Sequence, residues 1–121
     1  NDAADVYAGS QVGLETRIET MMSVIGDQPV LWVTVKSLLS HGPYSETNMR
    51  HWNHTLVNAC ARYPNMRIFD WASATNDSWF ISDGTHYTSE GYVQRAHLTA
   101  DALVHAFPAP GPEGSKGCVV H

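Results

Sequence analysis

The segment Val30-Leu31-Trp32-Val33-Thr34-Val35 is an almost unbroken run of β-branched and aromatic side chains. Such a run is typical of a strand buried on both faces, as in a parallel sheet that helices cover. Residues 66–71, with Ile68 and Phe69 at their centre, form a second short apolar run and predict another strand. Together the two runs predict an α/β fold built around a parallel sheet.

Three segments around these strands show apolar residues at helical spacing, which predicts amphipathic helices. The predicted helices cover residues 10–25, 46–63 and 90–107, and residues 1–9 and 36–45 are predicted to be loops. The predicted buried stripe of the last helix consists of Val93, Ala96, Ala100, Leu103, Val104 and Phe107. Helices and strands in this alternating order are typical of a doubly wound sheet. A sheet of two strands is only marginally stable, so we expect a partner segment to supply further strands.

Composition limits the classes of protein to consider. A length of 121 residues is typical of one domain, and 43% hydrophobic with 16% charged residues is typical of a globular chain. A net charge of −5 with seven scattered Lys and Arg argues against nucleic-acid binding. No apolar run approaches the roughly 20 residues of a membrane helix, so no membrane span is predicted. We expect one domain over residues 1–107 and a Pro/Gly-rich tail over residues 108–121.

Two cysteines allow two interpretations. Cys60 lies on a predicted helix and Cys118 lies in the tail. A disulfide between them would tie down the tail and would indicate an oxidising compartment, whereas two unrelated thiols would carry neither meaning. Neither cysteine has the spacing of a metal ligand. His51 and His54 could chelate a metal from one helix face, but a solvated face is the favoured interpretation, so no metal or cofactor is predicted.

The stretch from Trp79 to Tyr92 contains Asp83 and His86, three residues apart and separated by Gly84 and Thr85. A short loop with this spacing can aim both side chains at one point above a sheet. The carboxylate then orients the imidazole, as in the base half of a Ser-His-Asp hydrolase. The alternative is a polar loop that caps the following helix.

Other candidates follow from where ligands bind in open α/β sheets, beyond the carboxyl ends of the strands. The loop of residues 36–45 leaves such an end, so Ser37 and Tyr44 are substrate-binding candidates unless the loop is a plain surface connection. Trp79 either packs in the core or forms a wall of the pocket. Asp70, at the end of the second strand, is interpreted as a structural carboxylate.

The run Asp83-Gly84-Thr85-His86-Tyr87-Thr88, followed by Glu90-Gly91-Tyr92, resembles the C-terminal block of the SGNH (GDSL-like) hydrolase superfamily. Asn1-Asp2 resembles the end of that family's Gly-x-Asn-Asp block. Further segments resemble an actinobacterial-type branch: Trp52-Asn53, Tyr63-Pro64-Asn65-Met66 and Phe69-Asp70-Trp71. The resemblance implies a three-layer α/β/α, flavodoxin-like fold with a parallel sheet, of which this chain supplies the C-terminal part.

The resemblance also implies roles: His86 as general base, Asp83 as its partner and Asn1 as an oxyanion-hole donor. The family's nucleophile lies in a Gly-Asp-Ser block that this sequence does not contain. We therefore expect an N-terminal fragment of the same domain, carrying that serine, as a partner. The implied activity is that of an extracytoplasmic serine esterase or O-acyltransferase acting on an acyl ester of a cell-envelope glycan or lipid. The alternative is a noncatalytic binding or accessory domain derived from the same fold.

Overall fold

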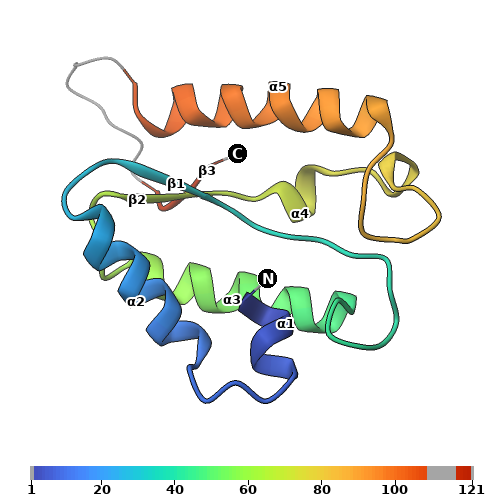
Figure 1. The fold of residues 1–121 in the computed structure, drawn as a ribbon. Coiled ribbons are helices and arrows are strands. Elements are labelled where there is room, and N and C mark those ends of the chain that lie inside the picture. The colour runs from blue at the N-terminus through green and yellow to red at the C-terminus, as the bar shows by residue number, and fades with distance from the viewer. Residues whose placement is uncertain (1, 109–116, 121) are drawn as a thin grey trace.

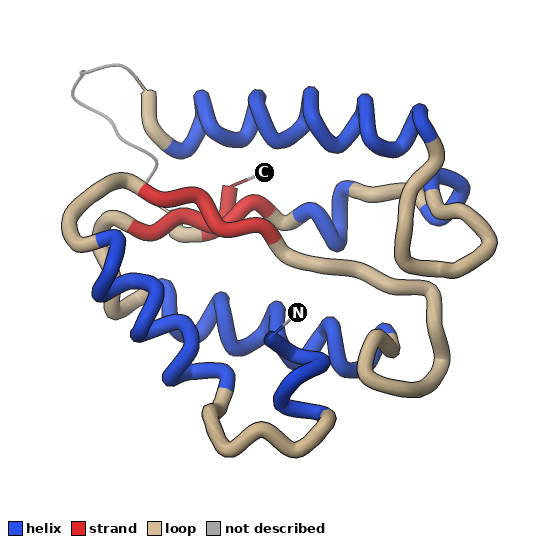
Figure 2. The backbone as a smooth tube through the Cα atoms, viewed as in Figure 1, coloured by secondary structure: helices blue, strands red, loops and turns tan. Residues whose placement is uncertain are grey.

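The computed structural model describes residues 2–108 and 117–120. In this part the chain is mixed α/β, about half helical, with a three-stranded parallel sheet (Figures 1 and 2). The helices are α1 (Asp2–Tyr7), α2 (Leu14–Ile25), α3 (Glu46–Cys60), α4 (Trp71–Ala74) and α5 (Ser89–Ala106), and a 3-10 turn, η1, covers Asp77–Trp79. The strands are β1 (Val30–Val33), β2 (Met66–Phe69) and β3 (Val119–Val120).

The sheet has the strand order β1-β2-β3, and both pairs are parallel. The register of the first pair runs from Val30 opposite Met66 to Val33 opposite Phe69. The two predicted strands are therefore present and parallel, although each is shorter than predicted. The third strand, Val119–Val120, comes from the segment predicted to be a tail, and no apolar run long enough to signal it occurs there.

Helices α1, α2 and α3 lie on one side of the sheet and α5 lies on the other (Figure 1). Between the sheet and the three-helix layer lie the fully buried side chains of Ile18, Leu56, Met66 and Ile68. A second cluster beneath α5 consists of Phe69, Trp71, Ala102, Ala106 and Val120. The sheet therefore separates two cores, of which the one on the α3 side is larger.

Helix α3 begins where the sequence predicts, because the Ser45 hydroxyl accepts a hydrogen bond from the backbone N–H of Asn48. Helix α2 does not begin at Ser10 as predicted; it begins at Leu14, after Gly13. The Ser10 hydroxyl instead accepts a hydrogen bond from the Arg17 guanidinium at 3.0 Å. Ser10 therefore belongs to the loop before the helix.

The loop predicted for residues 1–9 is wrong over most of its length, because α1 occupies residues 2–7. Arg17 explains why this segment is ordered: its guanidinium binds Asp2 at 2.9 Å and Asp5 at 3.2 Å, which joins α1 to α2. Ala3 and Ala4 are buried, so the helix also contributes to the core. Both anchors depend on tertiary contacts that local turn propensity does not reveal.

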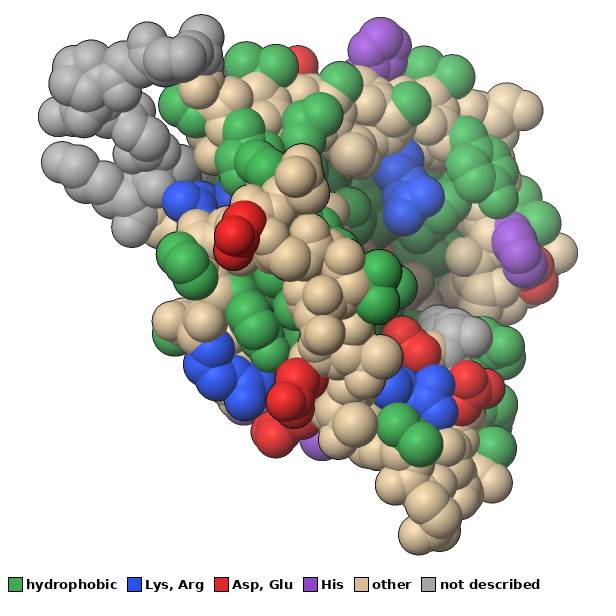
Figure 3. All heavy atoms as spheres, turned by 60° about the vertical axis from the view of Figure 1, so that its left-hand side comes forward, with side chains coloured by type: hydrophobic (Ala, Val, Ile, Leu, Met, Phe, Trp, Pro, Cys, Tyr) green, Lys and Arg blue, Asp and Glu red, His purple; other side chains and the backbone are tan. Residues whose placement is uncertain are grey.

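The predicted buried stripe of α5 is wrong except at Phe107, which is partly buried against the cluster beneath α5. Val93, Leu103 and Val104 are 53%, 50% and 67% exposed, whereas the buried positions are Gly91, Ala102 and Ala106. Ala102 and Ala106 let α5 approach the sheet closely, and Gly91 lets its start approach Trp79 and Tyr87. The apolar stripe on the outer side of α5 has no cover among the described residues. In the space-filling view, hydrophobic side chains lie along the top of the molecule (Figure 3). Others line a hollow in the same face, beneath this top row.

Candidate functional site

Residues 81–86 form a closed turn between η1 and α5. The Ile81 N–H donates to the His86 carbonyl at 2.9 Å, and the Gly84 N–H donates to the Ile81 carbonyl at 3.0 Å. Gly84 has a φ of +73°, a conformation that favours glycine. Its carbonyl accepts a hydrogen bond from the Leu38 N–H, and a Cβ there would lie only 3.0 Å from Leu39 Cδ2. The turn is therefore fixed internally and against the loop that follows β1.

This turn brings Asp83 and His86 together. Asp83 Oδ2 lies 2.6 Å from His86 Nδ1, while Asp83 Oδ1 accepts the backbone N–H groups of Thr85 and His86, each at 2.9 Å. These hydrogen bonds, of which the one from the His86 N–H has the largest effect, lower the pKa of the Asp83 carboxyl well below its ordinary value. Asp83 is therefore an ionised acceptor in a fixed orientation toward the imidazole.

The other side of the imidazole is open. The side chains of His86 and Asp83 are 68% and 43% exposed. Within residues 2–108 and 117–120, the hydrogen bonds of the His86 ring involve Nδ1 alone, with Asp83 and with the Thr85 hydroxyl at 3.2 Å. When Nδ1–H donates to a carboxylate, the lone pair of the neutral ring is on Nε2. This geometry is suited to accepting a proton at Nε2.

A pocket of about 460 Å³ opens beside His86. Its lining comes from the turn itself, from the chain that leaves β1 and from the start of α3: Val35, Lys36, Ser37, Tyr44, Met49, Thr85, His86 and Tyr87. Two predicted substrate-binding residues, Ser37 and Tyr44, thus share one pocket with the predicted base. Ser37 is only 2% exposed, and its hydroxyl accepts the Leu39 N–H at 3.1 Å. It has no hydrogen bond to His86, so the structure does not make it the nucleophile.

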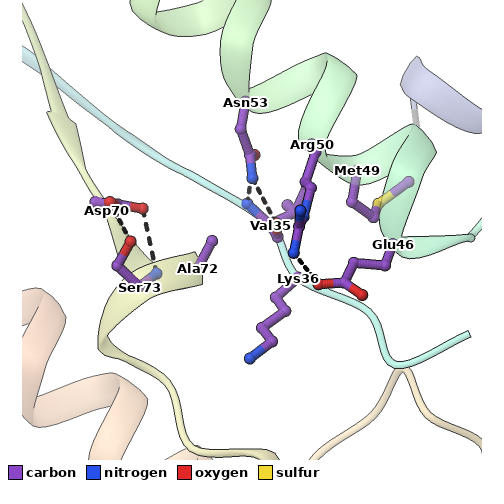
Figure 4. Close-up of a pocket in the computed structure, with 9 residues that line it drawn as sticks. All are labelled: Val35, Lys36, Glu46, Met49, Arg50, Asn53, Asp70, Ala72 and Ser73. Carbon is purple, nitrogen blue, oxygen red and sulfur yellow. Dashed lines mark hydrogen bonds and ion pairs between the residues drawn. The ribbon is translucent and has the colours of Figure 1, made fainter.

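A second pocket of about 320 Å³ shares Val35, Lys36 and Met49 with the first (Figure 4). The Asn53 side chain holds its wall, because its amide accepts the Val35 N–H at 2.8 Å and donates to the Val35 carbonyl at 2.7 Å. The cations at this site are paired: Lys36 with Asp77 at 2.6 Å and Arg50 with Glu46 at 2.7 Å. We call these two adjoining pockets together the trough. Its lining is partly apolar and partly made of charged side chains that are held in ion pairs.

Asp70 has a structural role in this trough. Asp70 caps α4, because its carboxylate accepts hydrogen bonds from the backbone N–H and the hydroxyl of Ser73. The same carboxylate accepts a hydrogen bond from the Thr34 hydroxyl at 3.0 Å. Thr34 in turn accepts the Ala72 N–H at 2.9 Å. The carboxylate is thus occupied in joining the ends of β1 and β2, as its position in the sequence suggests.

Another predicted site residue, Trp79, is not brought to His86. Trp79 stacks on the buried Trp71 ring at 5.9 Å between centroids, and it lines neither of the two pockets above. The predicted oxyanion donor Asn1 lies outside the described residues. Among the described residues, no group of His, Cys, Asp and Glu is arranged to hold a metal ion, and this includes His51 and His54.

Two residues of the site were missed in the sequence. Thr85 lies inside the recognised motif, and a hydroxyl beside a candidate base is a signal that could have indicated its contact with Nδ1. The two hydrogen bonds between the Asn53 side chain and the Val35 backbone join positions 18 residues apart, and the sequence around either position does not predict them. Such long-range contacts follow from the way α3 packs below the sheet.

The structure joins Cys60 and Cys118 in a disulfide, with their Cα atoms 6.2 Å apart. Of the two interpretations left open by the sequence, this is the one that ties the C-terminal segment to α3. In the described residues, no helix is both long enough and apolar enough to cross a membrane.

Comparison with known proteins returned no matching family model, no matching curated protein and no matching solved structure.

Proposed function

We propose that this chain supplies the base and the orienting carboxylate of an SGNH-type serine esterase or O-acyltransferase that acts on an acyl ester. The observation that supports this most strongly is the Asp83–His86 pair. Nδ1 is held at 2.6 Å from an ionised carboxylate, and Nε2, which has no hydrogen bond within the described residues, lies beside a pocket. The pocket is lined by the chain that leaves β1, where ligands bind in open α/β sheets.

In the proposed mechanism, a serine hydroxyl attacks the acyl carbonyl while His86 Nε2 takes its proton. The imidazolium then gives this proton to the leaving alcohol oxygen, and an acyl-enzyme remains. Water or a second alcohol attacks the acyl-enzyme by the reverse proton transfers, which restores the serine. Asp83 stabilises the imidazolium throughout. Asn1 is the proposed donor to the oxyanion, an interaction that is typically worth about 3 kcal/mol in the transition state.

The serine is assigned to an N-terminal segment of the same domain, which would complete a flavodoxin-like three-layer fold. The free edge of β1 supports this assignment. The N–H groups of Val30 and Thr34 donate toward β2, so the backbone groups of Leu31 and Val33 point to the opposite edge. Among the described strands, only β2 pairs with β1, which leaves that edge available for a further strand.

The proposed substrate is an acyl ester of a cell-envelope glycan or lipid, and the proposed location is extracytoplasmic. The Cys60–Cys118 disulfide supports the location, because disulfides persist in oxidising compartments. The trough beside His86 combines apolar walls with hydroxyl and charged groups, which fits an ester that joins an acyl chain to a polar alcohol.

The test uses the chain assembled with the segment that precedes it, and it measures hydrolysis of a nitrophenyl ester. His86→Ala should lower kcat/KM by roughly 10⁶-fold, the scale seen when the catalytic histidine of a serine protease is removed. His97→Ala, an exposed histidine on α5, is the matched control and should leave the rate unchanged. An unchanged rate in the His86 variant would contradict the assignment of His86 as the general base.

A noncatalytic binding or accessory domain is the second candidate. It is favoured by one observation: in the part of the chain that the structure describes, no serine hydroxyl is hydrogen-bonded to His86. Such a domain would bind the glycan or lipid ester with no turnover even when it is fully assembled. Binding that survives in the His86 variant, together with an absence of hydrolysis in both proteins, would support this candidate.

A further inference from the structure

The C-terminal strand β3 is short, yet it contributes to both cores. It pairs with β2 through Ile68 and Phe69, and the Ile68 N–H donates to the Cys118 carbonyl at 2.8 Å. Val119 packs against the cluster on the α3 side, while Val120 is buried in the cluster beneath α5. Removing β3 would therefore open one edge of β2 and one wall of each core.

Backbone pairing alone holds β3 weakly, because its two residues fall far short of the usual five or six. The Cys60–Cys118 disulfide supplies the stronger connection. Cys60 is the last residue of α3 and is buried, and Cys118 immediately precedes β3. The bond spans 58 residues of sequence, so it holds a distant segment in its place at the edge of the sheet.

We infer that this disulfide is a redox latch: its reduction releases β3 and loosens the C-terminal half of α5. A dithiol reductant would act by exchange. One thiolate attacks Cys118 Sγ, the sulfur of the less buried residue, and Cys60 leaves as a thiolate that takes up a proton. The second thiol then displaces Cys118, which also ends as a thiol, and the reductant leaves as a cyclic disulfide.

The latch acts on one end of α5 only. Ala102 and Ala106 are buried beside Val120. A pocket of about 400 Å³, lined in part by Leu98 and His105, already adjoins Ala102 and Val120. The other end of α5 is held independently by the Thr88 cap. Release of β3 should therefore loosen the far end of the helix and leave the turn that holds His86 in place.

Amide hydrogen exchange of the whole chain, read by mass spectrometry with and without a dithiol, tests this inference. After reduction, amides in β2 and in residues 102–107 should exchange at least tenfold faster. Amides in α2 and in residues 81–91 should be unchanged. The double variant Cys60→Ser/Cys118→Ser should exchange like the reduced protein and should ignore the dithiol.

Equal exchange in both redox states would overturn the inference. A uniform rise across α2, α3 and α5 would also overturn it, because the bond would then be a general stabiliser. If the double variant does not fold, Val120→Asp with the disulfide intact tests the same coupling. It should accelerate exchange in residues 102–107 and spare residues 81–91, and protection retained in residues 102–107 would contradict the latch.

Discussion

Helices α3 and α5 lie on opposite sides of the same sheet, but they are covered to different extents (Figure 1). Helix α3 contacts α1, α2 and the sheet, and its apolar residues Met49, Trp52 and Leu56 are buried. Helix α5 is the only long helix on its side among the described residues, and its outer residues Val93 and Leu103 are half exposed. The layer that contains α3 is therefore covered by other helices, whereas the layer on the opposite side of the sheet consists mainly of α5 among the described residues.

The largest expected effect is in the layer that contains α3. Leu56→Ala removes a side chain with no exposed area and should lower the free energy of unfolding by about 2–5 kcal/mol. Leu103→Ala is the matched control on α5 and should cost less than about 1 kcal/mol, since half of its side chain is already in water. Urea unfolding of both variants checks this, and equal losses would contradict the comparison.

The next effect concerns the close approach of the start of α5 to η1. A Cβ on Gly91 would lie 2.7 Å from the Trp79 carbonyl oxygen, so Gly91→Ala forces the start of α5 away from η1. The expected loss is about 1–3 kcal/mol of unfolding free energy. Gly13→Ala, at the cap of α2, meets no atom within 4 Å and should be close to neutral by the same measurement.

The turn beside α5 gives a prediction on pH. Because the folded pKa of Asp83 lies below its ordinary value of 3.8, the ionised carboxylate stabilises the turn above that pH. This stabilisation should be lost progressively as the pH falls from about 3.8 through the lower, folded value. NMR titration of the Asp83 carboxyl carbon should therefore show a midpoint below 3.8, and Asp83→Asn should remove this pH-dependent contribution to stability. A midpoint at or above 3.8 would contradict the hydrogen bonding.

The smallest effect is expected on the outer side of α5. Val93→Lys and Leu103→Lys place charges where the side chains already meet water, so together they should change the free energy of unfolding by less than about 1 kcal/mol. They should also reduce the fluorescence of a dye that binds exposed apolar surface. A loss as large as that of Leu56→Ala would mean that this stripe is covered in solution.

Local chemistry explains what the sequence could predict. The apolar runs at residues 30–35 and 66–71 predicted the two parallel strands, and Ser45 and Thr88 cap the helices expected to follow them. The spacing of Asp83 and His86 predicted their contact, because a turn of this length contains both partners.

Elements that depend on distant residues were missed. Helix α1 is ordered by Arg17, and β3 is held by pairing with β2 and by the bond from Cys118 to Cys60. Periodicity predicted that the apolar stripe with Val93, Leu103 and Val104 would be buried, but the small residues Ala102 and Ala106 face the sheet instead. In each case the deciding contact is long-range.

The central claim is that Asp83 and His86 activate a serine supplied by an N-terminal segment. A fluorophosphonate probe tests it directly, since such probes label activated serine hydroxyls covalently. With the assembled protein, intact and peptide mass spectrometry should find one labelled serine in that segment, and His86→Ala should abolish the label. An absence of labelling in the assembled protein, or labelling that persists without His86, would contradict the claim.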